Sequence, residues 1–127
     1  MMSMRTPLRQ VRGLGSARSG TEHFWHQRLT AMANIPLTIG FVVVVASLRG
    51  RNHAAVGQIL GSPLVAVLML LFILSASIHM RIGMQVIIED YVQDEGGKLV
   101  LVMANTFFAV VVALASAFAV LMLSFKV

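Results

Sequence analysis

The chain has 127 residues, of which 57% are hydrophobic and 12% are charged, and it has a net charge of +5 and no cysteine. So small a polar fraction excludes a soluble globular domain of this size and indicates an integral membrane protein. The lack of cysteine excludes disulfides, thiolate catalysis and cysteine-bound iron–sulfur clusters in this chain. The positive charge does not indicate binding to nucleic acid, because much of it precedes the first apolar run, at Arg5, Arg9, Arg12, Arg18 and Arg28.

Three apolar runs are long enough to cross a bilayer, whose hydrocarbon core of about 30 Å needs about 20 helical residues. These runs cover residues 29–48, 64–88 and 99–125. We therefore expect an all-α membrane protein with a single domain over residues 1–127. The arginines before the first run predict an N-terminus on the inside, and three spans then place the C-terminus outside.

The segment before the first run, residues 1–27, is expected to form a disordered cytoplasmic tail. Its first twenty residues are rich in arginine and free of acidic residues, which is also typical of a mitochondrial transit peptide. Glycines at positions 13, 15 and 20 and the direct passage into the first span favour the tail.

One histidine, His79, falls inside an apolar run, within the stretch IHMRIGMQVIIEDYV at residues 78–92. An ionisable side chain at membrane depth is costly and is usually retained for function. One reading is a neutral imidazole hydrogen-bonded to a serine or a backbone carbonyl of a neighbouring helix. We favour axial ligation of haem iron, and Gly83, one turn later on the same side of the helix, removes side-chain bulk beside the imidazole.

A six-coordinate haem b needs two axial ligands, and the other histidines lie outside the apolar runs. The methionines within the runs are ordinary filler of apolar helices. The second ligand is therefore expected from a histidine on another subunit. This predicts packing with a second membrane subunit, or less favourably a homodimer around one haem.

Two arginines lie close to the predicted haem site. Arg28 is either an interfacial anchor whose charged head reaches the membrane surface or a donor to a haem propionate. Arg81 projects about 200° away from His79 on a helix. It reaches the inner surface, pairs with a carboxylate of a partner chain or contacts a ligand near the haem, and the sequence leaves these alternatives open.

The helix of the second run ends just beyond the run, in Asp90 and Tyr91, and Asp90 projects within roughly 20° of His79, ~16 Å further along the helix. A helix end at the membrane interface attracts tyrosine and charged residues, which explains the pair without any function. Alternatively, Tyr91 donates a hydrogen bond to a quinone carbonyl and Asp90 supplies or tunes protons. A quinone site belongs where a membrane-soluble ring meets water, and this pair is expected there.

These residues resemble the smaller membrane-anchor subunit of bacterial succinate dehydrogenase, respiratory complex II. The resemblance rests on the histidine of IHMRIGM, its interval of eleven residues to Asp90, the ending DYV at 90–92 and the Arg-Leu-Thr-Ala at 28–31. It extends in outline over nearly the whole chain.

The resemblance implies that His79 is one axial ligand of haem b and that a larger cytochrome b anchor subunit provides the other. It implies that Arg28 contacts a haem propionate, that Gly83 packs against the haem, and that Tyr91 and Asp90 belong to a ubiquinone site. The further partners would be the iron–sulfur subunit and the flavoprotein subunit, which carries out succinate oxidation. The implied location is a bacterial inner membrane, with the mitochondrial inner membrane as the alternative.

Two other functions fit the same residues. A haem-b anchor of another quinone-linked oxidoreductase would share the haem ligand and have different soluble partners. A small haem-free transporter or assembly protein would use His79 and Arg81 as a polar pathway. Some members of the resembled family also lack haem.

Overall fold

The computed structural model describes residues 4, 6–12 and 19–125 of the chain. Every regular element in these residues is an α-helix. The helices are α1 (Pro7–Arg12), α2 (Ser19–Ser47), α3 (His53–Leu60), α4 (Pro63–Tyr91) and α5 (Glu95–Phe125). The prediction of an all-α protein is thereby confirmed.

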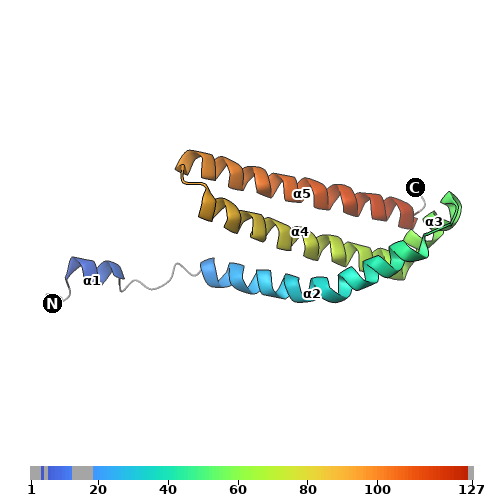
Figure 1. Ribbon diagram of the computed structural model, residues 1–127, viewed down its shortest axis with the longest axis horizontal. Coiled ribbons are helices and arrows are strands. Elements are labelled where there is room, and N and C mark those ends of the chain that lie inside the picture. Colours follow the sequence, from blue (N-terminus) through green and yellow to red (C-terminus); the bar gives the residue numbers. More distant parts are fainter. Residues whose placement is uncertain (1–3, 5, 13–18, 126–127) are drawn as a thin grey trace.

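Three of the helices, α2, α4 and α5, are long and apolar enough to cross a membrane, as predicted. They lie in a row with α4 in the middle (Figure 1). Among the described residues α4 contacts both neighbours, whereas α2 and α5 do not contact each other. We call the end of the row where α2 begins, α4 ends and α5 begins the Tyr91 end. A row of helices has two broad faces, and α4 contributes to both.

The first long helix begins earlier than predicted, at Ser19 instead of residue 29. The expectation of a disordered tail is therefore wrong for residues 19–27, and also for the short helix α1. Residues 19–27 contain no proline, and Glu22 in the first turn interacts favourably with the helix dipole. The ring of Phe24 also meets Trp25 edge-to-face, with centroids 6.1 Å apart.

Pro36 lies inside α2 and lacks the N–H that would bond the preceding turn. The helix nevertheless continues to Ser47 and curves along its length (Figure 1). Beyond the proline, α2 packs on α4 through stacked rings: Phe41 and Phe72 have centroids 4.9 Å apart. This stack fixes the end of the α2–α4 pair that lies away from the Tyr91 end.

The connection between α2 and α4, for which no helix was expected from the sequence, contains the short helix α3. Asn52 caps this helix, because its side-chain oxygen accepts a hydrogen bond of 2.9 Å from the amide of Ala55. Gly61 follows the helix and lies against α5, where an added Cβ would stand 2.5 Å from the carbonyl oxygen of Leu123. Glycine at this position therefore permits close approach of the turn to α5.

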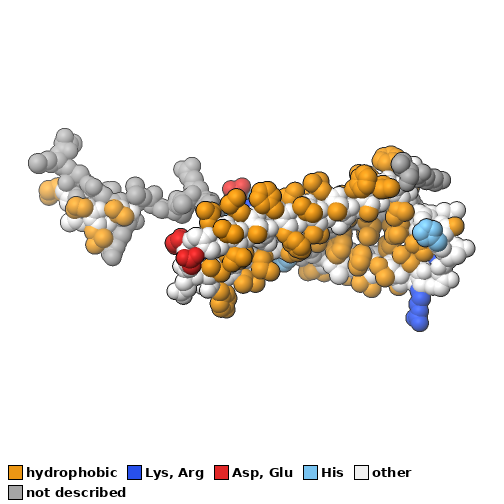
Figure 2. Space-filling view, turned by 90° about the horizontal axis from the view of Figure 1, so that it is seen from above, with side chains coloured by type: hydrophobic (Ala, Val, Ile, Leu, Met, Phe, Trp, Pro, Cys, Tyr) orange, Lys and Arg blue, Asp and Glu red, His pale blue; other side chains and the backbone are white. Residues whose placement is uncertain are grey.

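Hydrophobic side chains cover the outside of the row, and acidic side chains gather at the Tyr91 end (Figure 2). The buried hydrophobic residues are few, and the most buried are Ala109, Ala66 and Ile82. The two small alanines allow close helix contact. Since lipid is as apolar as these side chains, an outside of this kind suits a membrane or a partner subunit.

Candidate functional site

The polar centre of the row lies between α2 and α4, at His79. Its Nδ1 is 3.3 Å from the hydroxyl oxygen of Thr30 on α2. Thr30 is 8% exposed, and its hydroxyl also donates to the carbonyl of His26, one turn earlier, at 2.7 Å. The other ring nitrogen of His79, Nε2, has no hydrogen-bond partner among the described residues. The imidazole is therefore fixed through one nitrogen and offers the other.

A second bond joins the same helices one turn earlier on α4. The hydroxyl of Ser75, a residue 8% exposed, donates to the carbonyl oxygen of Thr30 at 3.2 Å. Thr30 is thus held twice from α4, through its side chain by His79 and through its backbone by Ser75. This pair of contacts sets the register between the two helices, and we call it the Thr30 clamp.

Gly83 lies one turn beyond His79 and faces α2. A Cβ added at Gly83 would meet the side-chain nitrogen of Gln27 at 3.4 Å, an ordinary van der Waals separation at its tight limit. The predicted gap beside the imidazole is therefore partly occupied by Gln27. The packing of a haem against Gly83 stays a prediction.

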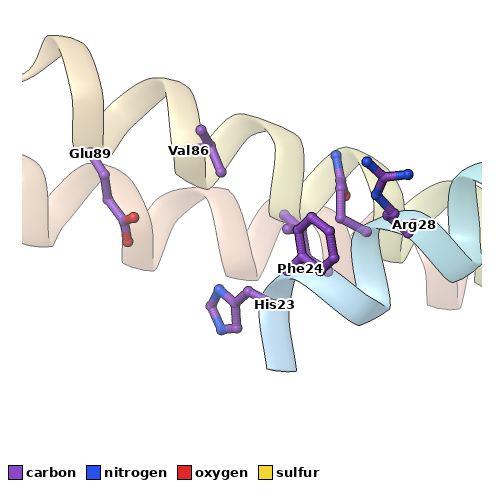
Figure 3. Close-up of a pocket in the computed structure, with 7 residues that line it drawn as sticks. His23, Phe24, Arg28, Val86 and Glu89 are labelled. Atoms are coloured by element: carbon purple, nitrogen blue, oxygen red, sulfur yellow. The ribbon is translucent and has the colours of Figure 1, made fainter. Parts of the chain in front are cut away.

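A groove of about 450 Å³ opens between α2 and α4 toward the Tyr91 end (Figure 3). Arg28 lines it from α2, with its guanidinium carbon 5.0 Å from the centroid of the Phe24 ring, and Glu89 lines it from α4. Glu89 accepts a hydrogen bond of 2.8 Å from Gln85. His79 does not line this groove, so the structure places Arg28 and His79 on the same helix pair without joining them in one cavity.

Two polar atoms of α2 are buried without a hydrogen-bond partner in the described part of the chain: the side-chain oxygens of Gln27 and Asn34. They lie about one turn on either side of Thr30. An unsatisfied buried acceptor costs about 1–3 kcal/mol, so native structures seldom leave one unpaired. Both oxygens are enclosed by this chain itself, so they form an unsatisfied polar spot within the α2 stripe on either side of Thr30.

Arg81 points away from His79, as its position two residues later predicts. Its Nε donates to the hydroxyl of Thr106 on α5 at 3.4 Å, and its backbone carbonyl accepts from Asn105 at 2.9 Å. Together with His23 and His26 of α2, Arg81 lines a smaller cavity of about 210 Å³ between α2 and α4. Arg81 therefore bonds α5 through its hydrogen bonds and also borders a cavity that α2 shares.

Asp90 and Tyr91 lie at the last turn of α4, as predicted, and the helix ends where Val92 takes an extended conformation. Both are exposed, Tyr91 to 81%. On a helix, Tyr91 stands about 18 Å from His79, so the structure does not bring the two predicted sites together. Neither residue lines the groove that Arg28 lines.

Comparison with known proteins shows the family to which the chain belongs. The family model for the succinate dehydrogenase/fumarate reductase transmembrane subunit matches residues 2–113. The chain belongs to this family. It is 33% identical over 110 residues to the succinate dehydrogenase hydrophobic membrane anchor subunit of Paracoccus denitrificans, covering 87% of this chain and 85% of that protein.

A second relative in the family, the anchor subunit of the same name from Rickettsia bellii (strain RML369-C), is 25% identical over 111 residues, or 87% of this chain and 89% of the relative. No solved structure matches the chain significantly. The family resemblance inferred from IHMRIGM and DYV is confirmed, and the chain is a multi-pass membrane anchor of the succinate dehydrogenase type.

The sequence did not single out Thr30, Ser75 or Gln27. A signal was present, since Gln27, Thr30 and Asn34 recur at intervals of three and four residues and form a polar stripe on one side of an otherwise apolar helix. What the stripe faces depends on helix pairing, and the structure supplies that pairing with α4.

Proposed function

We propose that the chain anchors a succinate dehydrogenase complex in a bacterial inner membrane and helps to bind haem b and ubiquinone. The N-terminus lies inside and the C-terminus outside. Succinate is oxidised on the flavoprotein subunit, and electrons pass through the iron–sulfur subunit to quinone at the membrane. The larger cytochrome b anchor subunit packs beside this chain and completes the haem site.

The observation that supports the haem assignment is the hydrogen bonding of His79, which occupies one ring nitrogen and leaves the other available. Its imidazole lies at membrane depth, held through Nδ1 by Thr30, with Nε2 free of any bond in the described residues. A neutral imidazole with one available nitrogen suits an axial position on haem iron, and the haem supplies one-electron redox chemistry when bound. His79 is the one iron ligand that we assign to this chain, and a histidine of the partner anchor subunit would provide the other.

Arg28 supports the same assignment. Its guanidinium faces an open groove and rests on the Phe24 ring, where its remaining donors are available to a propionate. The groove lies between α2 and α4, the helix pair that carries His79.

Tyr91 and Asp90 form the part of the quinone site that this chain contributes. Reduction of a quinone takes up two electrons and two protons, so the site needs contact with water as well as with lipid. The phenol of Tyr91 donates a hydrogen bond to a quinone carbonyl, which orients the ring, and the neighbouring carboxylate of Asp90 relays protons from the solvent. The exposure of both residues at the end of a membrane helix suits this role.

The experiment that tests the haem assignment is a reduced-minus-oxidised visible spectrum of the complex, purified through a tag on this chain. A b-type signal in the wild type that is lost or shifted in His79→Ala is the expected result. His53→Ala is the matched control, because His53 is exposed at the start of α3 and its loss leaves the spectrum unchanged.

Other outcomes separate the alternatives. A complex that contains its soluble partners but shows no b-type signal in the wild type removes the axial-ligand role and leaves a haem-free anchor. Copurification of soluble subunits other than a succinate-oxidising flavoprotein would assign the chain to another quinone-linked oxidoreductase.

A further inference from the structure

The protons around Thr30 can be assigned one by one. A threonine hydroxyl has one proton to donate and lone pairs to accept with. The carbonyl of His26 lies 2.7 Å from the Thr30 oxygen, whereas Nδ1 of His79 lies 3.3 Å away. A carbonyl has no proton to give, so the contact with His26 requires the hydroxyl proton. The Thr30 oxygen is then an acceptor toward His79.

The assignment determines the tautomer of His79. If the Thr30 oxygen accepts, Nδ1 of the imidazole must carry a proton, and in a neutral ring Nε2 then carries the lone pair. The position of the hydroxyl reinforces this choice, because Thr30 is only 8% exposed, which leaves little room for water to compete for its bonds.

The Thr30 clamp also restricts how the ring moves. The Ser75 hydroxyl, one turn before His79, donates to the backbone carbonyl of Thr30 at 3.2 Å. The acceptor that His79 uses is therefore held by the same helix that carries His79. A ligand group pre-oriented in this way keeps its lone pair in one direction.

We infer that Thr30 is a positioning residue for His79: its hydroxyl oxygen accepts the Nδ1 proton and leaves the Nε2 lone pair directed at the haem iron. This inference rests on the proposed function of His79. A hydrogen bond accepted from Nδ1 makes an imidazole a stronger donor, which favours ferric iron and lowers the haem potential. Partners of this kind change metal affinity on the order of 10-fold to 100-fold.

The test compares three variants of the purified complex. Thr30→Val keeps the shape and removes the acceptor, Thr30→Ser keeps the hydroxyl, and Ser75→Ala removes the other interhelical bond of the clamp without touching the ring. The measurements are haem per complex, the haem midpoint potential by redox titration, and the tautomer of His79 by nitrogen-15 NMR of histidine-labelled complex, assigned by difference with His79→Gln.

The expected result is a more positive midpoint potential and on the order of 10-fold weaker haem retention in Thr30→Val, with both values restored in Thr30→Ser. Ser75→Ala loosens the acceptor but keeps it, so a clearly smaller shift is expected there. An unchanged potential and unchanged haem content in Thr30→Val overturn the inference. An equal shift in Ser75→Ala also overturns it, because helix register and not the ring contact would then be responsible.

Failure of the proposed function gives a different pattern. A wild-type complex without haem overturns the ligand role of His79, and the proton assignment is then judged by NMR alone. A proton on Nδ1 that responds to Thr30→Val but not to Ser75→Ala supports the assignment, whereas a proton on Nε2 in the wild type overturns it. Should Thr30→Val fail to assemble, Thr30→Ala carries the same comparison with Thr30→Ser.

Discussion

Helix α4 shares one interface with α2 and another with α5, and polar side chains meet in both. Between α4 and α5, Asn105 donates to the carbonyl of Arg81, and Arg81 donates to Thr106. Between α2 and α4 the clamp bonds Thr30 twice, yet Nε2 of His79 and the oxygen of Gln27 stay unpaired in the described residues. The polar groups of the α4–α5 interface bond each other, whereas the α2–α4 interface leaves Nε2 of His79 available to a ligand from outside the chain.

We therefore assign a structural role to the polar residues between α4 and α5 and a ligand-binding role to those between α2 and α4. Polar residues that bond each other across membrane helices hold the helices together. Polar residues left open inside a membrane protein mark places where a cofactor or a partner subunit completes the structure. Changes at the α4–α5 interface are therefore expected to affect stability, and changes at the α2–α4 interface or at the end of α4 are expected to affect cofactor and quinone.

The largest effect is expected from Tyr91→Phe, which keeps the ring and removes the hydroxyl. Loss of one hydrogen bond to the quinone lowers the rate of quinone reduction on the order of tenfold or more. Succinate oxidation with an artificial acceptor stays unchanged, as do haem content and stability, because Tyr91 is 81% exposed and lies outside both interfaces. Equal loss of both activities would contradict the assignment of Tyr91 to the quinone site.

A smaller effect, on stability alone, is expected from Gly61→Ala. The new methyl group would meet the backbone carbonyl of Leu123 at 2.5 Å, so the turn must move away from α5. Overpacking of this kind costs about 1–3 kcal/mol, measured as a lower Tm of the purified complex. Gly57→Ala is the matched control, since a methyl group there meets nothing within 4 Å.

A Tm that does not fall in Gly61→Ala would contradict the tight contact between the turn and α5. Haem content is expected to stay constant in both glycine variants, because neither residue belongs to the α2–α4 interface. Loss of haem in Gly61→Ala at constant Tm would contradict the claim that the contact of this turn with α5 affects stability and not haem binding.

The smallest effect is expected from Asn105→Ala at the α4–α5 interface. Asn105 is 9% exposed and donates to the carbonyl of Arg81 at 2.9 Å. Hydrogen bonds between membrane helices contribute about 0.6 kcal/mol on average and up to about 1.7. Thermal unfolding should show this small loss of stability with an unchanged haem spectrum. A changed haem potential at constant Tm would contradict the assignment of Asn105 to stability alone.

Much of the fold could be predicted because membrane spans are determined by long apolar runs. The runs 64–88 and 99–125 lie within α4 and α5, and the run 29–48 lies within α2 except for its last residue. The end of α4 at Tyr91 was located by its polar residues. The early start of α2 was missed because Glu22 and the aromatic pair at 24–25 are equally compatible with an interfacial tail. The helix α3 was missed because eight residues give too little periodicity, although Asn52 is a typical N-cap.

The candidate site could be predicted only in part. The location of His79, Gly83 and Tyr91 along α4 followed from helix geometry, and Arg81 was correctly turned away from His79. The partner of His79 could not be predicted, because the sequence does not say which residues of one helix meet those of another. The alternative interpretation of His79 expected a hydrogen bond to a serine or a backbone carbonyl of a neighbouring helix. In the structure the partner is the hydroxyl of Thr30 on α2.

The order of the helices in space has a consequence for how the protein is made. Helix α2 leaves the ribosome before its only neighbour in the row, α4, has been synthesised. Until α4 arrives, Thr30 has only partners on its own helix, such as the carbonyl of His26, because His79 and Ser75 belong to α4. The register of the first span is therefore settled only once the second span has been made.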